Sequence, residues 1–123
     1  MSKLPENKAR ITLPQCTKSI AATEDALYVI GGKWRLRVMI ALKSGHTRFN
    51  DLQRTVIGIS ARVLSDELKE LELNGLVKRV VDSDQKPVVV EYIPTEYSKT
   101  LSVIISALVD WGIIHKAKIT SRI

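Results

Sequence analysis

Basic residues cluster in one part of this sequence. Residues 31–62 contain seven Lys and Arg side chains and a single acid, Asp51, whereas residues 63–77 contain one Lys and four acids. The whole chain of 123 residues has a formal charge of +6. A local excess of this kind is either a set of solvated helix faces or a surface that attracts phosphate groups, and charge alone leaves both interpretations open.

Side chains that carry catalysis or bind metals are few and scattered. Cys16 is the single cysteine, and His46 and His115 are the two histidines. This composition excludes an internal disulfide and a multi-cysteine zinc site. It offers no activated nucleophile and no phosphate loop of the Gly-Lys-Ser/Thr type. Six aromatic residues are too few for a platform that stacks single-stranded bases. We therefore expect neither an enzyme nor a bound cofactor.

The hydrophobic pattern predicts a mainly α-helical domain with one small β-hairpin. The expected helices cover residues 19–30, 33–43, 51–56, 61–74 and 96–116. The expected N-caps are Thr23 in the first helix, and Asn50, Ser60 and Thr95 before the last three. A very short strand is expected over residues 47–49, and the hairpin strands over 76–82 and 88–93. We expect a flexible N-terminal arm over 1–17, one folded domain over 18–116 and a C-terminal tail over 117–123.

This order of elements is that of a winged helix, in which residues 51–56, 57–59 and 60–74 make the helix-turn-helix. Leu64, Leu68 and Leu71 repeat on one side of the last helix and predict its buried face. Its other side is expected to enter a major groove, about 12 Å wide. The residues we expect to contact DNA there, or from the helix before it, are Arg48, Asn50, Ser60, Arg62, Ser65 and Lys69. The isoleucines of the turn, Ile57 and Ile59, are available to the core, and the later acids, such as Glu67, keep the far end away from DNA.

The hairpin would be the wing. Lys78 and Arg79 flank its first strand and Lys86 lies at its tip, where these cations would meet phosphates beside a minor groove. The alternative is a solvated hairpin, which the nearby Asp82 and Asp84 favour.

The last helix is more apolar than a free surface helix needs to be. Its apolar side is formed by Leu101, Ile104, Ile105, Leu108 and Trp111. These residues belong either to the core of a monomer or to the interface of a twofold homodimer, which would bury them. A dimer also suits duplex DNA, because two recognition helices about 34–36 Å apart reach successive grooves on one face. Trp34 is expected in the core, on the apolar side of helix 33–43 that also carries Val38, Ile40, Ala41 and Leu42.

Several segments together resemble the HxlR-type, MarR-like winged helix-turn-helix transcriptional regulators. They are IGGKW at 30–34, RFNDL at 48–52, GIS at 58–60, GLVKR at 75–79, VEY at 90–92, TEY at 95–97 and WG at 111–112, together with the leucine repeat. The resemblance covers residues 16–112 and departs from the family pattern at Thr17, Pro94 and Ser98. It implies a homodimer, built through the N- and C-terminal helices, that binds a palindromic operator in double-stranded DNA.

Cys16 has two interpretations. It is an incidental thiol on a mobile arm, or a candidate redox sensor whose thiolate is favoured by Lys18 nearby. The resemblance implies the second, since several members sense oxidants or electrophiles through a cysteine at this end. A small-molecule or oxidant effector is therefore an expected partner. His46 is expected to be a polar loop residue.

The sequence start lacks an apolar signal segment, and the longest apolar stretches look too short and interrupted for a membrane helix, which needs about 20 residues. We therefore expect a cytoplasmic protein that does not enter a membrane. The competing function is a winged-helix protein–protein interaction module without sequence-specific DNA binding. Binding that weakens steeply with salt would favour DNA over such a module.

Overall fold

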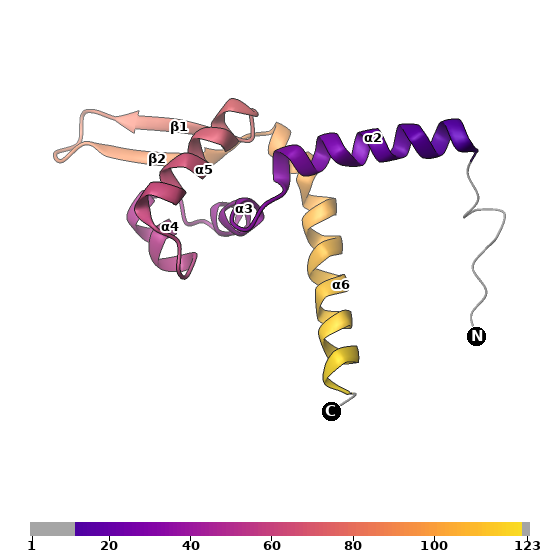
Figure 1. Cartoon of the computed structure of the whole chain (residues 1–123). Coiled ribbons are helices and arrows are strands. Elements are labelled where there is room, and N and C mark those ends of the chain that lie inside the picture. The colour runs from indigo at the N-terminus through magenta and orange to yellow at the C-terminus, as the bar shows by residue number, and fades with distance from the viewer. Residues whose placement is uncertain (1–11, 122–123) are drawn as a thin grey trace. The chain divides into compact units, whose positions relative to one another are not determined.

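The structure is a computed structural model that describes residues 12–121 (Figure 1). Two compact units make up the chain, Met1–Gly32 and Lys33–Ile123. The first contains helix α2 (Leu13–Ile30). The second contains α3 (Arg35–Lys43), α4 (Phe49–Thr55), α5 (Ala61–Leu73), β1 (Val77–Asp82), β2 (Val89–Pro94), the 3₁₀ helix η1 (Tyr97–Leu101) and α6 (Ser102–Thr120).

Helix α2 begins six residues earlier than the sequence pattern predicted. Thr12 is its N-cap: the Thr12 hydroxyl accepts a hydrogen bond from the Gln15 N–H (3.2 Å), and Gln15 Oε1 accepts one from the Thr12 N–H (2.9 Å). This capping box satisfies two free donors at the helix start. Thr23, predicted as the N-cap, lies inside the helix. The predicted flexible arm was therefore wrong for residues 13–17, and its residues 1–11 lie outside the described part of the chain.

Helix α2 ends at Ile30, as predicted. The Gly31 N–H donates to the Leu27 carbonyl (2.7 Å), and a Cβ on Gly31 would lie only 2.3 Å from that oxygen. A larger residue would have to break this turn, so glycine is required where the helix stops. Along α2, large apolar side chains such as Leu13, Leu27 and Tyr28 are exposed.

The core of the second unit is formed around α5. Leu64, Leu68 and Leu71 are almost completely buried, which confirms the predicted stripe. They pack with α3, and α3 also contacts α4 and β2. Burial of this kind supplies most of the favourable free energy of folding.

The buried face of α3 was predicted only in part. Val38 and Leu42 are buried as expected, and Met39, which was not predicted to be buried, is as completely buried as Val38. Ile40 is 41% exposed and Trp34 is half-buried, so their expected core positions were wrong. Successive residues in a helix differ by about 100° in direction. Burying Val38, Met39 and Leu42 therefore turns Ile40 outward.

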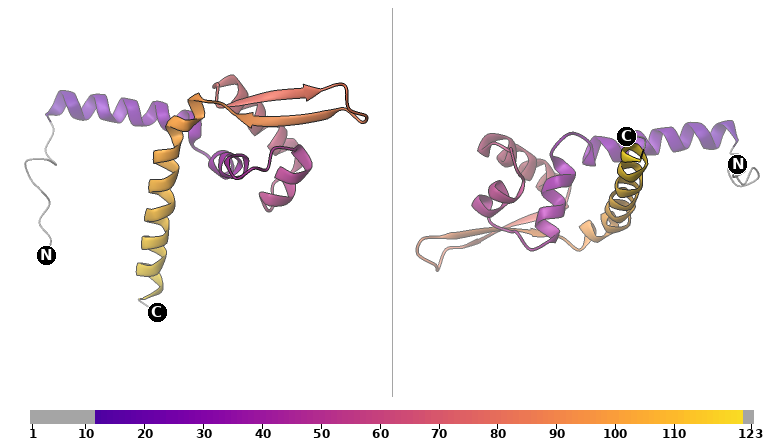
Figure 2. Two further views of the ribbon diagram at one scale, coloured as in Figure 1. Left: turned by 180° about the vertical axis from the view of Figure 1, so that it is seen from behind. Right: turned by 90° about the horizontal axis from the view of Figure 1, so that it is seen from below.

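The hairpin pairs β1 with β2 in antiparallel register, with Arg79 opposite Tyr92, and it projects beyond the helices of its own unit (Figures 1 and 2). The predicted strand at residues 47–49 does not form. A single backbone hydrogen bond, from the Tyr92 N–H to the Thr47 carbonyl (2.8 Å), ties this segment to the sheet. Helix α4 then begins at Phe49 with Arg48 as its N-cap, so the predicted cap at Asn50 was wrong.

After the hairpin, the chain forms η1 before α6. The Thr95 hydroxyl accepts from the Ser98 N–H (3.2 Å), which agrees with the predicted cap at Thr95. Helix α6 continues to Thr120, so most of the predicted tail at 117–123 is helical. Ser98 is buried, and its hydroxyl also receives a hydrogen bond from Lys43 Nζ (3.2 Å).

Helix α6 projects away from α3, α4 and α5, and it buries none of its own residues (Figure 2). The segment Tyr97–Thr120 is 24 residues long, and an 18-residue window within it has a mean hydropathy of 1.3, so by length and composition alone it is apolar enough to cross a membrane. The expectation that every apolar stretch is too short and interrupted for a membrane helix was therefore wrong for this segment. Asp110, Lys116 and Lys118 interrupt the apolar surface of α6.

Candidate nucleic-acid interface

The helix-turn-helix of α4, the turn 56–60 and α5 forms as predicted, with one change in the turn. Val56 and Ile59 are buried, but Ile57 is 85% exposed, so it does not join the core. Gly58 has φ +90°, a left-handed conformation that favours glycine and reverses the chain between them. A Cβ on Gly58 would contact the ring of Trp34 at 3.6 Å. Trp34 therefore supports the turn that sets the direction of α5.

Ser60 caps α5, as predicted. Its backbone is extended, and its Oγ accepts a hydrogen bond from the Val63 N–H (3.1 Å). A serine in this position satisfies a free amide of the first turn and fixes where the helix begins. The remaining N–H groups and the helix dipole make this end favourable for an anion such as phosphate.

The outward side of α5 carries the predicted recognition residues. Arg62 and Lys69 are exposed and Ser65 is half-buried. Their spacing of three and four residues puts them on one face, opposite the buried leucines. Asp66 shares this face, so the surface is not purely cationic.

The predicted DNA-contacting cations have no acidic partner in the described residues 12–121, whereas three other Lys and Arg side chains do. Arg35 pairs with Glu67, Arg54 with Asp51, and Lys99 with Glu96. Within the described residues 12–121, no ion pair involves the following six: Arg48, Arg62, Lys69, Lys78, Arg79 and Lys86. All six are exposed. Their charge is therefore available to an anionic partner.

The Arg35–Glu67 pair assigns Glu67 a role that the sequence analysis missed. Arg35 Nε lies 3.2 Å from Glu67 Oε2, and both side chains are mostly buried. The contact joins α3 to the middle of α5. Glu67 therefore holds the recognition helix in place, and the expectation that it merely keeps the far end away from DNA was incomplete. Opposite charges 32 residues apart gave no local signal for this pairing.

Arg48 and Asn50 lie at the start of α4, and the structure brings them close to the start of β2, beside the hairpin turn. Both line a surface cavity of about 460 Å³ together with Arg54 and residues 87–90. Two elements that the sequence analysis treated separately, the bracing helix and the wing, thus share one hollow with two arginines in its wall.

The wing residues are not equivalent. Side chains alternate across a strand, so Lys78 and Arg79 point to opposite faces of the hairpin. Lys86 is exposed in the turn. Asp82 accepts hydrogen bonds from the Asp84 N–H (3.2 Å) and the Gln85 side chain (3.0 Å), so its carboxylate organises the turn.

His46 and Cys16, the other candidates, lie in different units. His46 Nδ1 is 2.7 Å from Asp51 Oδ2, which makes it a loop residue tied to α4. Cys16 is a half-buried free thiol in the first turns of α2, not part of a mobile arm. Among residues 12–121 no cluster of three or more His, Cys, Asp or Glu side chains could hold a metal ion.

The apolar side of α6 is mostly open to solvent. Leu108 and Trp111 are 49% and 61% exposed, whereas Leu101 is buried in the core of its own unit. Leu101 is therefore a core residue and unsuited to the interface predicted for it. Trp111 stacks on His115 with a centroid distance of 4.8 Å. The exposed apolar surface is also broader than predicted, because it includes Val103, Val109, Ile113 and Ile114.

Comparison with known proteins agrees with this geometry. The sequence model of the HxlR-like helix-turn-helix family matches residues 29–119. An HTH-type transcriptional regulator of Methanothermobacter thermautotrophicus is 40% identical over 93 residues, covering 76% of this chain and 70% of that protein. YtcD of Bacillus subtilis, another HTH-type regulator, is 37% identical over 94 residues, covering 76% and 74%.

Solved structures give the same result. The redox regulator HypR in its reduced form matches with a TM-score of 0.75 and 37% identity, covering 81% of this chain and 98% of HypR. The reduced transcriptional regulator YodB from Bacillus subtilis matches with a TM-score of 0.65 and 33% identity, covering 72% and 85%.

Proposed function

This chain belongs to the family of HxlR-like helix-turn-helix transcriptional regulators, and we propose that it binds a palindromic DNA operator as a homodimer. Membership makes it a DNA-binding transcriptional regulator and not an enzyme. In the proposed complex, α5 lies in the major groove and the hairpin contacts the flanking backbone or minor groove.

The observation that carries the proposal is the free charge on α5. The apolar side of α5 is buried within its own unit, and its charged side remains exposed to solvent. Arg62 and Lys69 are exposed there without an acidic partner in the described residues. Arginine forms bidentate hydrogen bonds with guanine edges and with phosphates, and lysine contributes a point charge. Arg48, Lys86 and one of the two β1 cations would add phosphate contacts.

The homodimer is supported by the exposed apolar surface of α6. Ile104, the half-buried Ile105, Leu108 and Trp111 would pack against a second copy, and the large apolar residues that α2 exposes would also take part in dimer formation. Large apolar side chains that are exposed together on one helix mark an interaction site. Two copies related by a twofold axis would present two α5 helices to the two half-sites of a palindrome.

Selection of bound sequences from random duplex DNA tests the proposal directly. The expected result is an inverted repeat with half-site centres about 10 base pairs apart. A selection that yields no shared sequence would contradict the proposal that the chain binds a specific operator. For DNA binding, the logarithm of the affinity should fall linearly with the logarithm of the salt concentration. A protein–protein module that docks its partner through the apolar surface of α6 would show little dependence on salt.

Because the composition of α6 would also suit a membrane helix, a second experiment tests whether α6 binds lipid. We propose a cytoplasmic protein whose α6 is covered by protein, so the purified chain should stay in the supernatant when it is sedimented with lipid vesicles. Sedimentation with the vesicles, together with a monomeric remainder in solution, would assign α6 to lipid instead.

We also propose Cys16 as the oxidant-sensing residue. One similar protein, HypR, is described as a redox regulator, and its structure is solved in a reduced and in an oxidised form. With one thiol per chain, oxidation either joins two subunits or caps the thiol. Diamide treatment should therefore change operator affinity in the wild type and leave it unchanged in Cys16→Ser. An equal response in both proteins would remove Cys16 from the mechanism.

A further inference from the structure

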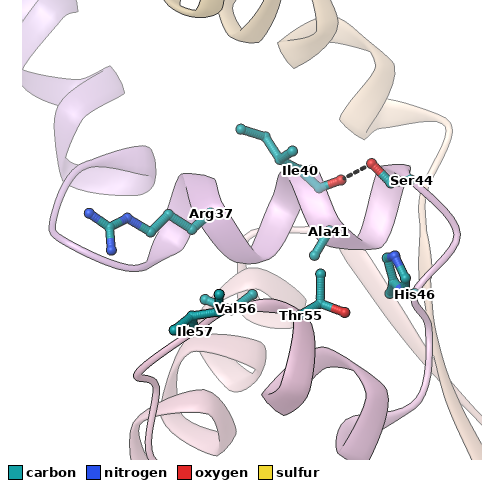
Figure 3. A pocket seen from close by; sticks show the side chains of 8 residues that line it. All are labelled: Arg37, Ile40, Ala41, Ser44, His46, Thr55, Val56 and Ile57. Atoms are coloured by element: carbon teal, nitrogen blue, oxygen red, sulfur yellow. Dashed lines mark hydrogen bonds between the residues drawn. The ribbon is translucent and has the colours of Figure 1, made fainter.

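A cavity of about 400 Å³ lies between helix α3 and the turn that precedes α5, within the unit Lys33–Ile123. Its walls come from the outward side of α3, from His46, and from the end of α4 with the first residues of the turn (Figure 3). The volume falls within the range of small-molecule sites, about 300–1,000 Å³. None of the residues discussed as DNA contacts lines it.

Much of the cavity wall is aliphatic. Ala41 and Val56 are buried, while Ile40 and Ile57 are 41% and 85% exposed. Two large aliphatic side chains thus stand open to solvent around a hollow. An apolar body placed there would remove their surface from water, which is favourable in proportion to the area covered.

The two ends of the cavity differ in whether their side chain already has an acidic partner. Arg37 and His46 lie at opposite ends in Figure 3. His46 is already bonded to Asp51 at 2.7 Å. Arg37, by contrast, has no ion pair within the described residues 12–121; its guanidinium carbon lies 5.3 Å from the centroid of the Trp34 ring. Beside its aliphatic wall, the cavity therefore presents a guanidinium that has no acidic partner among residues 12–121.

We propose that this cavity binds a small apolar carboxylate. Its hydrocarbon body would lie on Ile40, Val56 and Ile57, and its carboxylate would pair with Arg37 in the bidentate geometry that a guanidinium offers. Because Val56 and Ile57 belong to the turn that sets α5, such a ligand contacts the support of the recognition helix. Its binding is thereby coupled to operator affinity, a step that rests on the proposed function.

Isothermal titration calorimetry on the full chain, without DNA, tests the site itself. The probe is naphthoate, with naphthalenemethanol as its neutral counterpart. Naphthoate should bind saturably, with one site per chain, and about tenfold more tightly than the alcohol, as expected for a charge-assisted contact. Equal affinities, or no binding of naphthoate at millimolar concentration, would overturn the proposal.

Lys33 provides a matched control for Arg37. Its Nζ lies 4.8 Å from the centroid of the same Trp34 ring, but Lys33 does not line the cavity. Arg37→Gln should weaken naphthoate binding about tenfold and leave the alcohol unaffected, whereas Lys33→Gln should change naphthoate binding by less than about twofold. Equal effects of the two substitutions would mean that general positive charge, and not the cavity, binds the probe.

Ile57→Glu locates the occupant. Ile57 is exposed, so the change should not unfold the chain, but it puts a carboxylate at the cavity wall and should abolish naphthoate binding. Binding that persists in this variant would place naphthoate elsewhere and overturn the assignment.

Operator binding separates this proposal from the proposed function. Saturating naphthoate should change operator affinity by about fivefold or more in the wild type and not in Arg37→Gln. Normal naphthoate binding without any operator binding would sink the proposed function alone. Normal binding of both, with no mutual effect, would overturn the coupling to α5.

Discussion

Helices α5 and α6 use their apolar residues in opposite ways. In α5, three leucines are buried within the chain and the charged side faces solvent. In α6, the mean composition is more apolar, yet no residue is buried. A helix that is apolar around most of its circumference is normally covered by protein or lipid. The apolar side of α5 is thus covered within one chain, whereas the apolar surface of α6 is left uncovered by the described residues 12–121.

This difference separates folding from assembly. Changes on the buried side of α5 should act on the stability of the chain, because that side is part of its core. Changes on α6 should leave the chain folded and act on association. Changes on the outward side of α5 should alter neither the stability of the chain nor its association, and should change only its affinity for DNA.

The largest effect is expected from a charge on α6. Leu108→Asp places a carboxylate in the proposed interface, where burying it unpaired is strongly unfavourable. Operator affinity should fall toward the non-specific level, a loss of about 4 kcal/mol or more. Sedimentation equilibrium should show monomers, and circular dichroism an unchanged helix content.

Ser106→Asp is the control for Leu108→Asp, since residue 106 lies on the other side of α6 and is also exposed. It should stay dimeric. If Leu108→Asp remains a dimer with full affinity, α6 does not form the interface.

Leu64→Ala should give the next largest effect, on stability. Leu64 is completely buried, and its truncation leaves a cavity beside α3, which costs about 3 kcal/mol of unfolding free energy. Chemical denaturation monitored by circular dichroism measures this cost. Leu73→Ala, at an exposed leucine of the same helix, should cost less than about 1 kcal/mol. Similar losses in both variants would contradict the buried stripe.

The sequence predicted α5 better than α6, and the reason is physical. The leucine repeat, the Ser60 cap and the glycine in the turn are local signals, and each is confirmed. Glu67 could not be assigned, because its partner Arg35 lies on another helix. Ile57 was misplaced because apolar character alone does not show which residue of a tight turn points outward.

The ends of the chain show the same limit. The Thr12–Gln15 capping box is a local signal that could have been found, and it would have placed the start of α2 correctly. The burial of Leu101 and the exposure of the α6 residues that follow it could not have been predicted. Composition does not show at which residue a helix stops packing on the core of its own chain.

Arg62→Gln should affect DNA binding alone. Removing one recognition contact should cost about 1–3 kcal/mol of operator binding and relax selectivity at a single base position. Binding titrations with the selected operator and its single-base variants measure both effects. Arg54→Gln is a suitable control, because Arg54 is an exposed arginine that already pairs with Asp51. An Arg62→Gln protein with wild-type affinity and selectivity would show that α5 presents a different side to DNA.

Ser60→Ala should give the smallest effect, and it tests whether the two sides of α5 are independent. The change removes the hydroxyl that accepts from the Val63 N–H, which costs about 1 kcal/mol of unfolding free energy. Ser60 also stands at the α5 end that favours phosphate, so operator affinity should fall by a similar small amount. Ser60→Asp separates the two effects: it restores the cap and the stability, but its negative charge repels phosphate. A Ser60→Asp protein with wild-type operator affinity would show that the start of α5 lies away from the DNA backbone, and the proposed docking of the helix would have to be turned accordingly.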